Sequence, residues 1–439
     1  MSAAASKLSA AGRWFVGGRC HDVAVATSAL RRIVDPVIAA PPAGVRVRTR
    51  LKVTAAEAAT LTTIGLFLGS VYRSELAGRI RCGVLGPDGQ RAWRAERKRA
   101  ITAVSSSRWA GAITRTVEDQ YQLGMRSLTA QVTNLRAAIS VLEPRCALRP
   151  GELAPVDHDD AGTKRPSRRQ RGYRNKAERF VKTRRLAALR ERLVTAERTL
   201  AAGCPSITVG GKRFWRNRNN LDAAELSEQQ WRQQWDSCRM FFTADGESGR
   251  TGGNETIRVD GDGHLRIKTP SDLVGELGSH VVIAAPVRFS FRGEEWAARV
   301  AARQAVRYDL SYDSIRGRWY IDASWTITPE PMCELAELRT TRVLGVDLNV
   351  DDLACCILDA SGNPIGRPTN IELPTVEMSA SRRDGRVRAA ITALLDHAQV
   401  AGCGAVVVEN LGFADDNQER LACRQVGAWR RQLVKLLSV

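Results

Sequence analysis

Hydrophobic and polar residues alternate along several short stretches of the chain, a pattern typical of β-strands with one buried face. The first stretch is VRVRTRLKV at residues 45–53, where the apolar or neutral positions predict a core face. Its other face is wholly cationic, which makes it a candidate track for backbone phosphates. The residues of that face are Arg46, Arg48, Arg50 and Lys52.

Two later stretches predict β-hairpins. In ETIRVDGDGHLRIK at residues 255–268, alternating apolar positions face each other across a Gly-rich turn. The tip DGDGH lacks a glutamate at the twelfth position from Asp260, so turn chemistry explains it better than a calcium loop. Residues 306–312 and 319–327 alternate in the same way around the turn DSIRGR.

Helical periodicity lies between these strands. Thr54 and Glu57 match a capping box, which predicts a helix that begins there and ends near Arg79. Two later runs of apolar residues recur at spacings of three and four, which predicts an antiparallel helical hairpin inserted into a β-rich domain. The runs are Tyr121, Met125, Leu128, Val132, Leu135, Ile139 and Leu142, and Leu186, Leu189, Leu193, Ala196 and Leu200.

The pattern changes after Pro331. VLGVDL, LACCILD and PIGRPTNIEL predict three meandering strands, a helix-compatible stretch follows, and AVVV at residues 405–408 predicts a fourth, buried strand. This β-β-β-α-β order is the RNase H-like arrangement, in which the first and fourth strands lie side by side. Asp347 on the first strand and Glu409 after the fourth are therefore expected to converge.

Converging carboxylates suit Mg²⁺, a hard cation that prefers oxygen ligands. Two such ions can activate a water and stabilise the leaving oxygen of a phosphodiester. We expect Asp347 and Glu409 to bind metal, since an unpaired Asp buried in an apolar strand would be costly. The alternative is that these acids form turns or cap a helix, and for Asp351 and Asp352 the turn interpretation is favoured.

Charge indicates the partner. The chain has 439 residues, enough for two to four domains, and 66 Lys plus Arg against 47 Asp plus Glu give a net charge of +19. An excess on this scale is typical of proteins that bind nucleic acid, with a membrane surface as the weaker alternative. No membrane span or secretory signal is predicted, so we expect a cytoplasmic, nucleoid-associated protein. No C-x-x-C pair occurs, so zinc is not expected.

The densest basic segment is KRPSRRQRGYRNKAERFVKTRR, whose one acid is Glu178. A solvated helix face is the ordinary explanation of such a run. Because neutralising partners are scarce, nucleic-acid binding is favoured, with RNA and DNA both open. The predicted contacts are Arg168, Arg169, Arg171, Tyr173, Arg174, Lys176, Arg179, Lys182, Arg184 and Arg185.

These patterns predict an α+β multidomain protein. We expect a poorly ordered arm at residues 1–44 and a discontinuous β-rich domain at residues 45–86 and 205–335. Residues 87–204 form the helical insert, and residues 336–439 the N-terminal part of an RNase H-like nuclease domain.

Two motifs resemble one known family. GVDLNVDDLACCILDASGNPIG and AVVVENLGF are similar to the first and second RuvC motifs of the TnpB (OrfB) family, the insertion-sequence nucleases related to type V CRISPR effectors. The layout is similar too, with a β-barrel wedge domain interrupted by a helical recognition domain. The resemblance implies that Asp347 and Glu409 are the first two catalytic carboxylates, and it implies Mg²⁺, a guide RNA and a target DNA.

The resemblance is incomplete. The family has a third catalytic Asp and usually a four-cysteine zinc ribbon well downstream of the second motif, whereas 30 residues with one cysteine, Cys423, follow Glu409 here. Asp415 and Asp416 follow Glu409 too closely to replace that acid. We therefore expect a transposon-associated endonuclease that is truncated and weakly active or inactive. The alternatives are a non-cleaving RNA- or DNA-binding protein derived from it, and an RNase H-fold DNA transposase that needs no guide.

Overall fold

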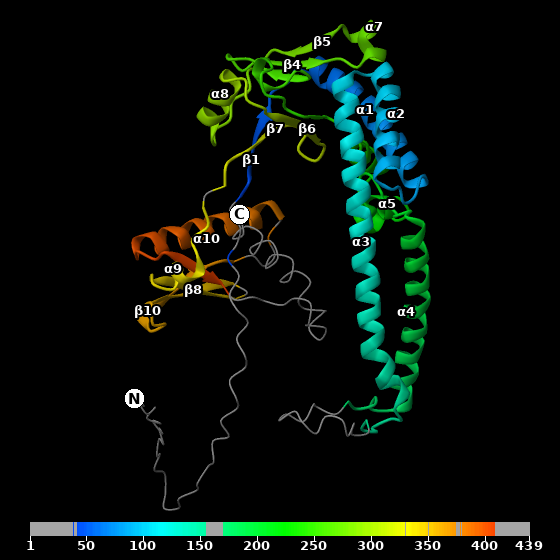
Figure 1. The fold of residues 1–439 in the computed structure, drawn as a ribbon, viewed down its shortest axis with the longest axis vertical. Helices are drawn as coiled ribbons and strands as arrows, with labels where there is room; N and C mark the ends of the chain where they lie inside the picture. The colour runs from blue at the N-terminus through cyan, green and yellow to red at the C-terminus, as the bar shows by residue number, and fades with distance from the viewer. Residues whose placement is uncertain are drawn as a thin grey trace, which may run out of the picture. The chain divides into compact units, whose positions relative to one another are not determined.

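The computed structural model describes residues 38, 42–154, 170–329, 331–349, 351–374, 378 and 380–408 (Figure 1). It is a mixed α+β structure with several small sheets. The chain divides into two compact units, with a boundary between Pro329 and Glu330 where the sequence predicted one at 335/336. The predicted N-terminal arm lies almost wholly outside the described residues.

The larger unit, Pro42–Pro329, contains a four-stranded sheet in the order β1-β7-β6-β2. The predicted strand at residues 45–53 is confirmed as β1, and it pairs antiparallel with β7 in a register that places Val47 opposite Ala323. A strand before the helices therefore completes a sheet formed by strands after them, as expected for an insertion. The strands are β1 (Gly44–Leu51), β2 (Thr243–Ala244), β6 (Arg307–Asp313) and β7 (Arg318–Thr326).

The second sheet of this unit has three strands in the order β3-β4-β5. The predicted hairpin is confirmed, with Ile257 opposite Ile267 and Val259 opposite Leu265. The prediction of a β-barrel is wrong, because the described strands form two open sheets. One reason is that β2 pairs over two residues, too short to extend the first sheet around to β1. The strands are β3 (Ile257–Val259), β4 (Leu265–Lys268) and β5 (His280–Ile283).

One buried side chain connects the two sheets. Asn254 is 0% exposed, and its amide nitrogen donates to the carbonyls of Ala244 and Val306, each at 3.0 Å. Its side-chain oxygen accepts from the backbone N–H groups of Thr256 and Ile257 at 2.9 and 3.0 Å. Both donor hydrogens and both acceptor sites of this amide are satisfied, which is what makes its burial tolerable.

Helix α1 (Ala55–Arg81) begins as the sequence predicted. Thr54 accepts from the Glu57 backbone N–H, and the Glu57 carboxylate accepts from the Thr54 N–H at 2.7 Å, which completes the capping box. By length and composition α1 is the one helix among the described residues that could cross a membrane. However, its Leu61, Ile64 and Leu68 are fully buried in the core of this unit, as in the central helix of a globular fold.

The helical hairpin is confirmed. Helix α3 (Ser107–Ala147) runs beyond the sheets, and α4 (Lys176–Ala202) packs along its distal half (Figure 1). Val132, Leu135 and Ile139 are buried against Leu186 and Leu189, so the predicted apolar residues form the contact.

The insert is not a separate core, although the sequence predicted a boundary at 86/87. Helix α2 (Pro87–Val104) and the first turns of α3 bury Ile101, Trp109 and Ile113 in the same cluster as the strands. The Trp109 indole N–H also donates to the Lys268 carbonyl at 3.0 Å. The remaining short elements are α5 (Lys212–Asn217), η2 (Asp222–Ala224), α6 (Glu228–Ser237), η3 (Thr251–Gly253), η4 (Ser271–Leu273), α7 (Val274–Leu277) and α8 (Gly293–Ala301).

The C-terminal unit has the predicted β-β-β-α-β order. Its sheet runs β10-β9-β8-β11, in which β8 and β11 are parallel and adjacent. Helix α10 covers one face, where Leu344 and Val346 of the sheet pack with Val387 and Leu394. The elements are α9 (Leu335–Leu338), β8 (Val343–Leu348), β9 (Asp352–Leu358), β10 (Pro364–Glu372), α10 (Ala380–Val400) and β11 (Ala405–Val408).

Candidate metal site and nucleic-acid surfaces

Asp347 lies on β8, near the carboxyl end of the strand. Successive residues of a strand point to opposite faces of the sheet. Since Val346 and Leu348 are buried against α10, Asp347 points to the opposite face and is exposed. Its side chain makes no hydrogen bond or ion pair with any residue that the structure describes. The argument from burial is therefore wrong for Asp347, because the strand places this carboxylate in solvent rather than in the core.

The adjacent strand ends at the same edge of the sheet. In the parallel register of β8 and β11, Val408 is the partner of Val346, the residue before Asp347. Glu409 is the next residue of the chain and lies outside the described residues. The structure thus brings the two predicted strand ends together and describes one of the two predicted carboxylates.

A shallow depression borders Asp347 on this face of the sheet. Its volume is about 340 Å³, and apart from Asp347 its lining is apolar or cysteine. A single carboxylate in such surroundings offers one oxygen ligand, so a complete metal site needs further ligands from outside these residues. The lining residues are Gly345, Val346, Asp347, Ala354, Cys355, Cys356 and Pro368.

Asp351 and Asp352 take part in the connection between β8 and β9. The Asn349 backbone N–H donates to the carbonyl of Asp352 at 3.1 Å, and the Leu373 N–H donates to the carbonyl of Asp351 at 2.7 Å. These backbone contacts are in keeping with the turn-forming role that the sequence favoured for both residues.

The cationic face of β1 meets acids on the neighbouring strands. Asp322 on β7 is directly opposite Arg48 on one side and Asp309 on the other. Arg48 binds Asp322 through two hydrogen bonds of 2.9 and 3.0 Å, and Arg46 adds a third at 3.1 Å. Two adjacent aspartates repel each other, and the two arginines offset that repulsion. Their charge is therefore partly neutralised within the sheet.

The remaining two residues of that predicted track are different. Arg50 and Lys52 are both exposed, and neither forms an ion pair within the described part of the chain. Of the four predicted contacts on β1 and its end, these two are the ones whose charge is available to a polyanion.

The basic segment of the hairpin is partly described, since Arg168 and Arg169 lie outside the described residues. Arg179 is half-buried and donates to the Cys146 carbonyl at 3.0 Å, and Lys182 is also half-buried. The other predicted cations are exposed, and none of them forms an ion pair with a described residue. They are Arg171, Arg174, Lys176, Arg184 and Arg185.

Tyr173 does not belong to this surface. The side chain is 2% exposed and packs in the hairpin core, with the Arg145 guanidinium 4.4 Å from its ring centroid. Burial raises the pKa of its hydroxyl. The prediction of Tyr173 as a nucleic-acid contact is therefore wrong, because the chain turns its ring inward to close the end of the hairpin. The aromatic residue that this segment exposes is Phe180, at 63%.

The structure also shows a cationic surface that the sequence analysis missed. The outer face of the sheet β3-β4-β5 carries Arg258 opposite Arg266 and Lys268 opposite His280. None of these four residues forms an ion pair with a described acid. The same alternation that predicted the hairpin, Arg and Lys between Ile, Val and Leu, could have revealed this face.

The pKa of His280 reflects the positive charge of that surface. Burial and the charges of Arg266, Lys268 and Arg258 all lower its pKa. The Arg266 guanidinium lies 3.1 Å from His280 Nδ1, and because a guanidinium can only donate, Nδ1 accepts and the proton of the neutral ring is on Nε2. A face that disfavours a further positive charge is suited to binding phosphate.

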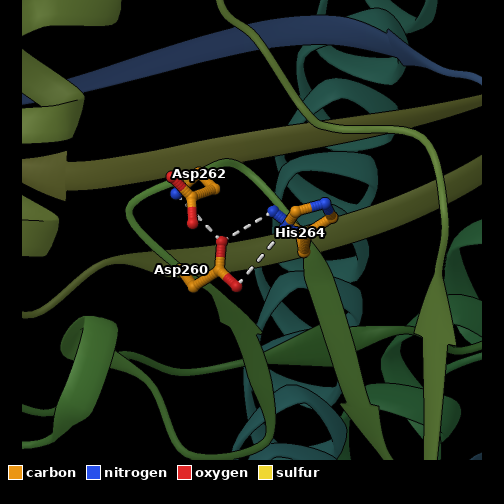
Figure 2. A group of neighbouring side chains, drawn as sticks. All are labelled: Asp260, Asp262 and His264. Atoms are coloured by element: carbon orange, nitrogen blue, oxygen red, sulfur yellow. Dashed lines mark hydrogen bonds and ion pairs between the residues drawn. The ribbon is translucent and has the colours of Figure 1, made fainter.

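The turn between β3 and β4 gathers Asp260, Asp262 and His264 (Figure 2). One carboxylate oxygen of Asp260 accepts from the backbone N–H groups of Asp262 and His264, at 3.0 and 2.8 Å. These are the bonds of an Asx turn, which explains why the acid is at this position. By distance alone the three exposed side chains could hold a metal ion, and the turn accounts for them without one.

Comparison with known proteins gives no family for the chain. No protein-family model matches it, and no curated protein matches it either.

Proposed function

We propose that this chain is a transposon-associated, RNA-guided DNA endonuclease with an RNase H-like catalytic domain. The observation that carries the proposal is the parallel pairing of β8 with β11, which puts Asp347, exposed and with no side-chain partner among the described residues, beside the strand that Glu409 follows. Chemistry at the carboxyl ends of adjacent parallel strands is the general rule for open α/β sheets. The guide RNA and the DNA target rest on the motif resemblance.

Asp347 has the properties that a ligand for a hard divalent cation needs. It is exposed, free of ion pairs within the described residues, and held on a strand rather than on a loop. Asp347 and Glu409 would hold Mg²⁺, which when bound activates water and stabilises the leaving oxygen of a phosphodiester. Asp347 itself contributes a carboxylate that orients the ligand, at the border of the shallow depression on this face of the sheet.

The described surfaces support a nucleic-acid substrate. Cations that form no ion pair with a described acid occur at the end of β1, along α4 and across the three-stranded sheet. Phosphate neutralisation by such residues dominates the affinity of most nucleic-acid-binding proteins. Three separate cationic surfaces on one chain favour a long or branched nucleic-acid ligand.

The test is a cleavage assay with the RNA that the chain itself acquires. The chain is expressed together with the DNA that flanks its gene, the copurified RNA is sequenced, and a plasmid matching that RNA is the substrate. We expect Mg²⁺-dependent cutting that falls at least about 10³-fold in Asp347→Ala, because a two-metal site acts as a unit.

Asp396→Ala is the matched control, since Asp396 is an exposed acid on α10 of the same unit. Cutting by Asp347→Ala at the rate of the unaltered chain would overturn the proposal, as would cutting that persists in EDTA. Cleavage that survives removal of the RNA would favour the transposase that needs no guide.

A non-cleaving nucleic-acid-binding protein is the second candidate. It is favoured by the finding that the described residues supply one carboxylate at the junction of β8 and β11, with no group of three ligands around it. This alternative predicts that RNA copurifies and that binding weakens with salt, while no divalent ion produces cutting.

A further inference from the structure

A short segment beside the hairpin, residues 212–218 with the sequence KRFWRNR, has a role that neither the predicted sites nor the proposed nuclease site explains. It forms α5 and its C-terminal cap. Four of its seven residues are cationic, and no acid occurs between Glu197 and Asp222. Such a stretch creates a local positive potential without neutralising neighbours in sequence.

Trp215 in this segment is exposed while its tryptophan neighbours are buried. Its exposure is 46%, compared with 7% for Trp231 and 8% for Trp235 on α6. Large aromatic side chains contribute most when they are buried, so an exposed Trp next to a buried Trp pair has a position that packing alone does not favour.

The buried pair holds Trp215 in a fixed orientation. Trp231 and Trp235 stack with ring centroids 5.6 Å apart, and Trp235 lies 5.9 Å from Trp215 at an angle of 37°. The Trp231 indole N–H donates to the carbonyl of Phe214, the residue before Trp215, at 2.8 Å. The exposed ring thus packs against a buried aromatic pair, and packing of this kind restricts its orientations and lowers the entropy cost of binding to it.

One cation contacts the exposed ring, and others lie within three residues of it in sequence. The Arg218 guanidinium lies 4.5 Å from the centroid of Trp215, a cation–π contact, and Arg218 is an exposed residue. Lys212 and Arg216 are also exposed, and none of these three residues forms an ion pair with a residue that the structure describes. By contrast, Arg232 on α6 is paired with Glu228.

We infer that Trp215 and Arg218 form a binding site for single-stranded nucleic acid, in which an unpaired base stacks on the indole and the adjoining phosphates contact Arg218, Lys212 and Arg216. A π-face mounted among unneutralised cations is the usual composition of such sites. Bases within a duplex are already stacked on one another, so the site distinguishes single strands from duplexes. This site is independent of Asp347 and goes beyond the proposed function.

The test measures binding by fluorescence anisotropy in EDTA, so that no cleavage contributes. The probes are a labelled oligo-dT of about 12 nucleotides, within the usual span of a single-strand site, an oligo-U of the same length, and a blunt duplex. Trp215→Ala is expected to weaken binding of one or both single strands about 10-fold and of the duplex less than about 2-fold, because base–aromatic stacking is lost. Trp215→Phe keeps an aromatic ring and is expected to retain most of the affinity.

Arg218→Ala makes the test independent of how Trp215→Ala folds, since the Arg218 side chain is exposed. We expect about a 3-fold loss on single strands, against no change for the ion-paired Arg232→Ala. Phe291→Ala is the control for removing an exposed aromatic ring, as Phe291 is 70% exposed elsewhere in the same unit.

Three outcomes would overturn the inference. The first is unchanged single-strand affinity in both Trp215→Ala and Arg218→Ala. The second is an equal loss on the duplex, which would leave charge alone as the cause. The third is displacement of the oligonucleotide by polyglutamate of equal charge as effectively as by unlabelled oligo-dT, which would identify an acidic protein segment as the ligand. A loss confined to oligo-U, or to oligo-dT, supports the inference and assigns the site to RNA or to DNA.

Discussion

The two four-stranded sheets each carry an aspartate on an inner strand, and the two aspartates have opposite surroundings. Asp322 on β7 is 3% exposed and accepts hydrogen bonds from Arg46 and Arg48. Asp347 on β8 is exposed and has no partner among the described residues. In sequence the two acids look alike, because each stands between two apolar residues of a strand.

The difference separates a structural acid from a candidate functional one. A buried carboxylate must be paired to be tolerated, and Asp322 is paired twice. A carboxylate that is rigidly placed and unpaired keeps its ligand capacity for something outside the protein, which is the condition Asp347 meets. The presence of partners, and not the position in a strand, distinguishes the two roles.

The largest expected effect is the difference in stability between a variant without Asp322 and a variant without Asp347. Asp322→Ala should lower the free energy of unfolding of the larger unit by about 2–3 kcal/mol, because two arginines lose a shared acceptor. Asp347→Ala should change stability by no more than about 0.5 kcal/mol, as expected for an exposed side chain with no polar partner among the described residues.

Urea unfolding followed by tryptophan fluorescence measures the first effect, because every described tryptophan lies in the larger unit. Circular dichroism follows both units and measures the second. Equal destabilisation by the two substitutions would remove the distinction between these acids.

A second prediction contrasts two arginines of β1. Arg48→Ala should destabilise the protein by about 1.5–2 kcal/mol, since it removes charge-assisted hydrogen bonds to a buried carboxylate. Arg50→Ala should leave stability nearly unchanged and reduce nucleic-acid affinity. The measurements are urea unfolding and oligonucleotide binding on the same two variants. If Arg48→Ala weakens nucleic-acid binding more than Arg50→Ala does, the assignment of Arg48 to stability and Arg50 to binding is wrong.

A third prediction concerns the sheet β3-β4-β5, whose basic residues form no ion pair with a described acid. Replacing Arg266 and Lys268 together by Gln should reduce the slope of log affinity against log salt by about 1.4–1.8, if each residue contacts one phosphate. Stability should rise slightly or stay the same, because unfavourable like-charge neighbours are removed. A salt titration of oligonucleotide binding measures the slope. An unchanged slope would show that this face does not contact nucleic acid.

The smallest expected effect is the pH dependence of the α1 cap. Burial acts to raise the pKa of Glu57, but hydrogen bonds from the Ala284 and Thr54 backbone N–H groups and the Thr54 hydroxyl outweigh it and lower the pKa. Because the pKa of Glu57 is lower in the folded state than in the unfolded state, its ionised carboxylate stabilises the fold at pH values above the unfolded-state pKa of about 4.3. That stability is lost as the pH falls through the folded-state pKa.

Glu57→Gln should therefore cost about 0.5–1 kcal/mol at pH 7, and this cost should shrink as the pH falls from 5 toward 3. Unfolding curves at pH 3, 5 and 7 measure the difference. Glu96→Gln is the control, because Glu96 on α2 is 70% exposed. A cost that stays constant across this range would show that the Glu57 charge does not stabilise the fold.

Alternation and caps predicted most of the local structure, because both depend on residues close in sequence. The capping box at Thr54, the hairpin at residues 257–267 and the interlocking helices α3 and α4 are confirmed in detail. The adjacency of β8 and β11 was also predicted, because the β-β-β-α-β order matches the RNase H-like arrangement, in which the first and fourth strands lie side by side; the structure shows that the pairing is parallel.

What the sequence could not predict depends on contacts between distant residues. Nothing near Arg48 in sequence indicates that Asp322 will neutralise it, 274 residues away. Tyr173 lies in a basic segment that suggested a surface, and its burial follows from how the ends of α3 and α4 meet. The exposure of Asp347 follows from which face α10 covers, a choice that periodicity leaves open.

Because α10 lies between β10 and β11 in sequence, the ribosome makes β11 well after its partner strand β8. Strands β8, β9 and β10 are complete at Glu372, while their last partner, β11, ends 36 residues later at Val408. At a synthesis rate of about 5–20 residues per second, the edge of β8 remains unpaired for roughly 2–7 s before β11 is made. During that interval a bare strand edge is open to wrong pairing. Asp347 therefore gains its second neighbouring strand only after α10 has been made, and a nascent chain cannot assemble the proposed metal site before β11 emerges.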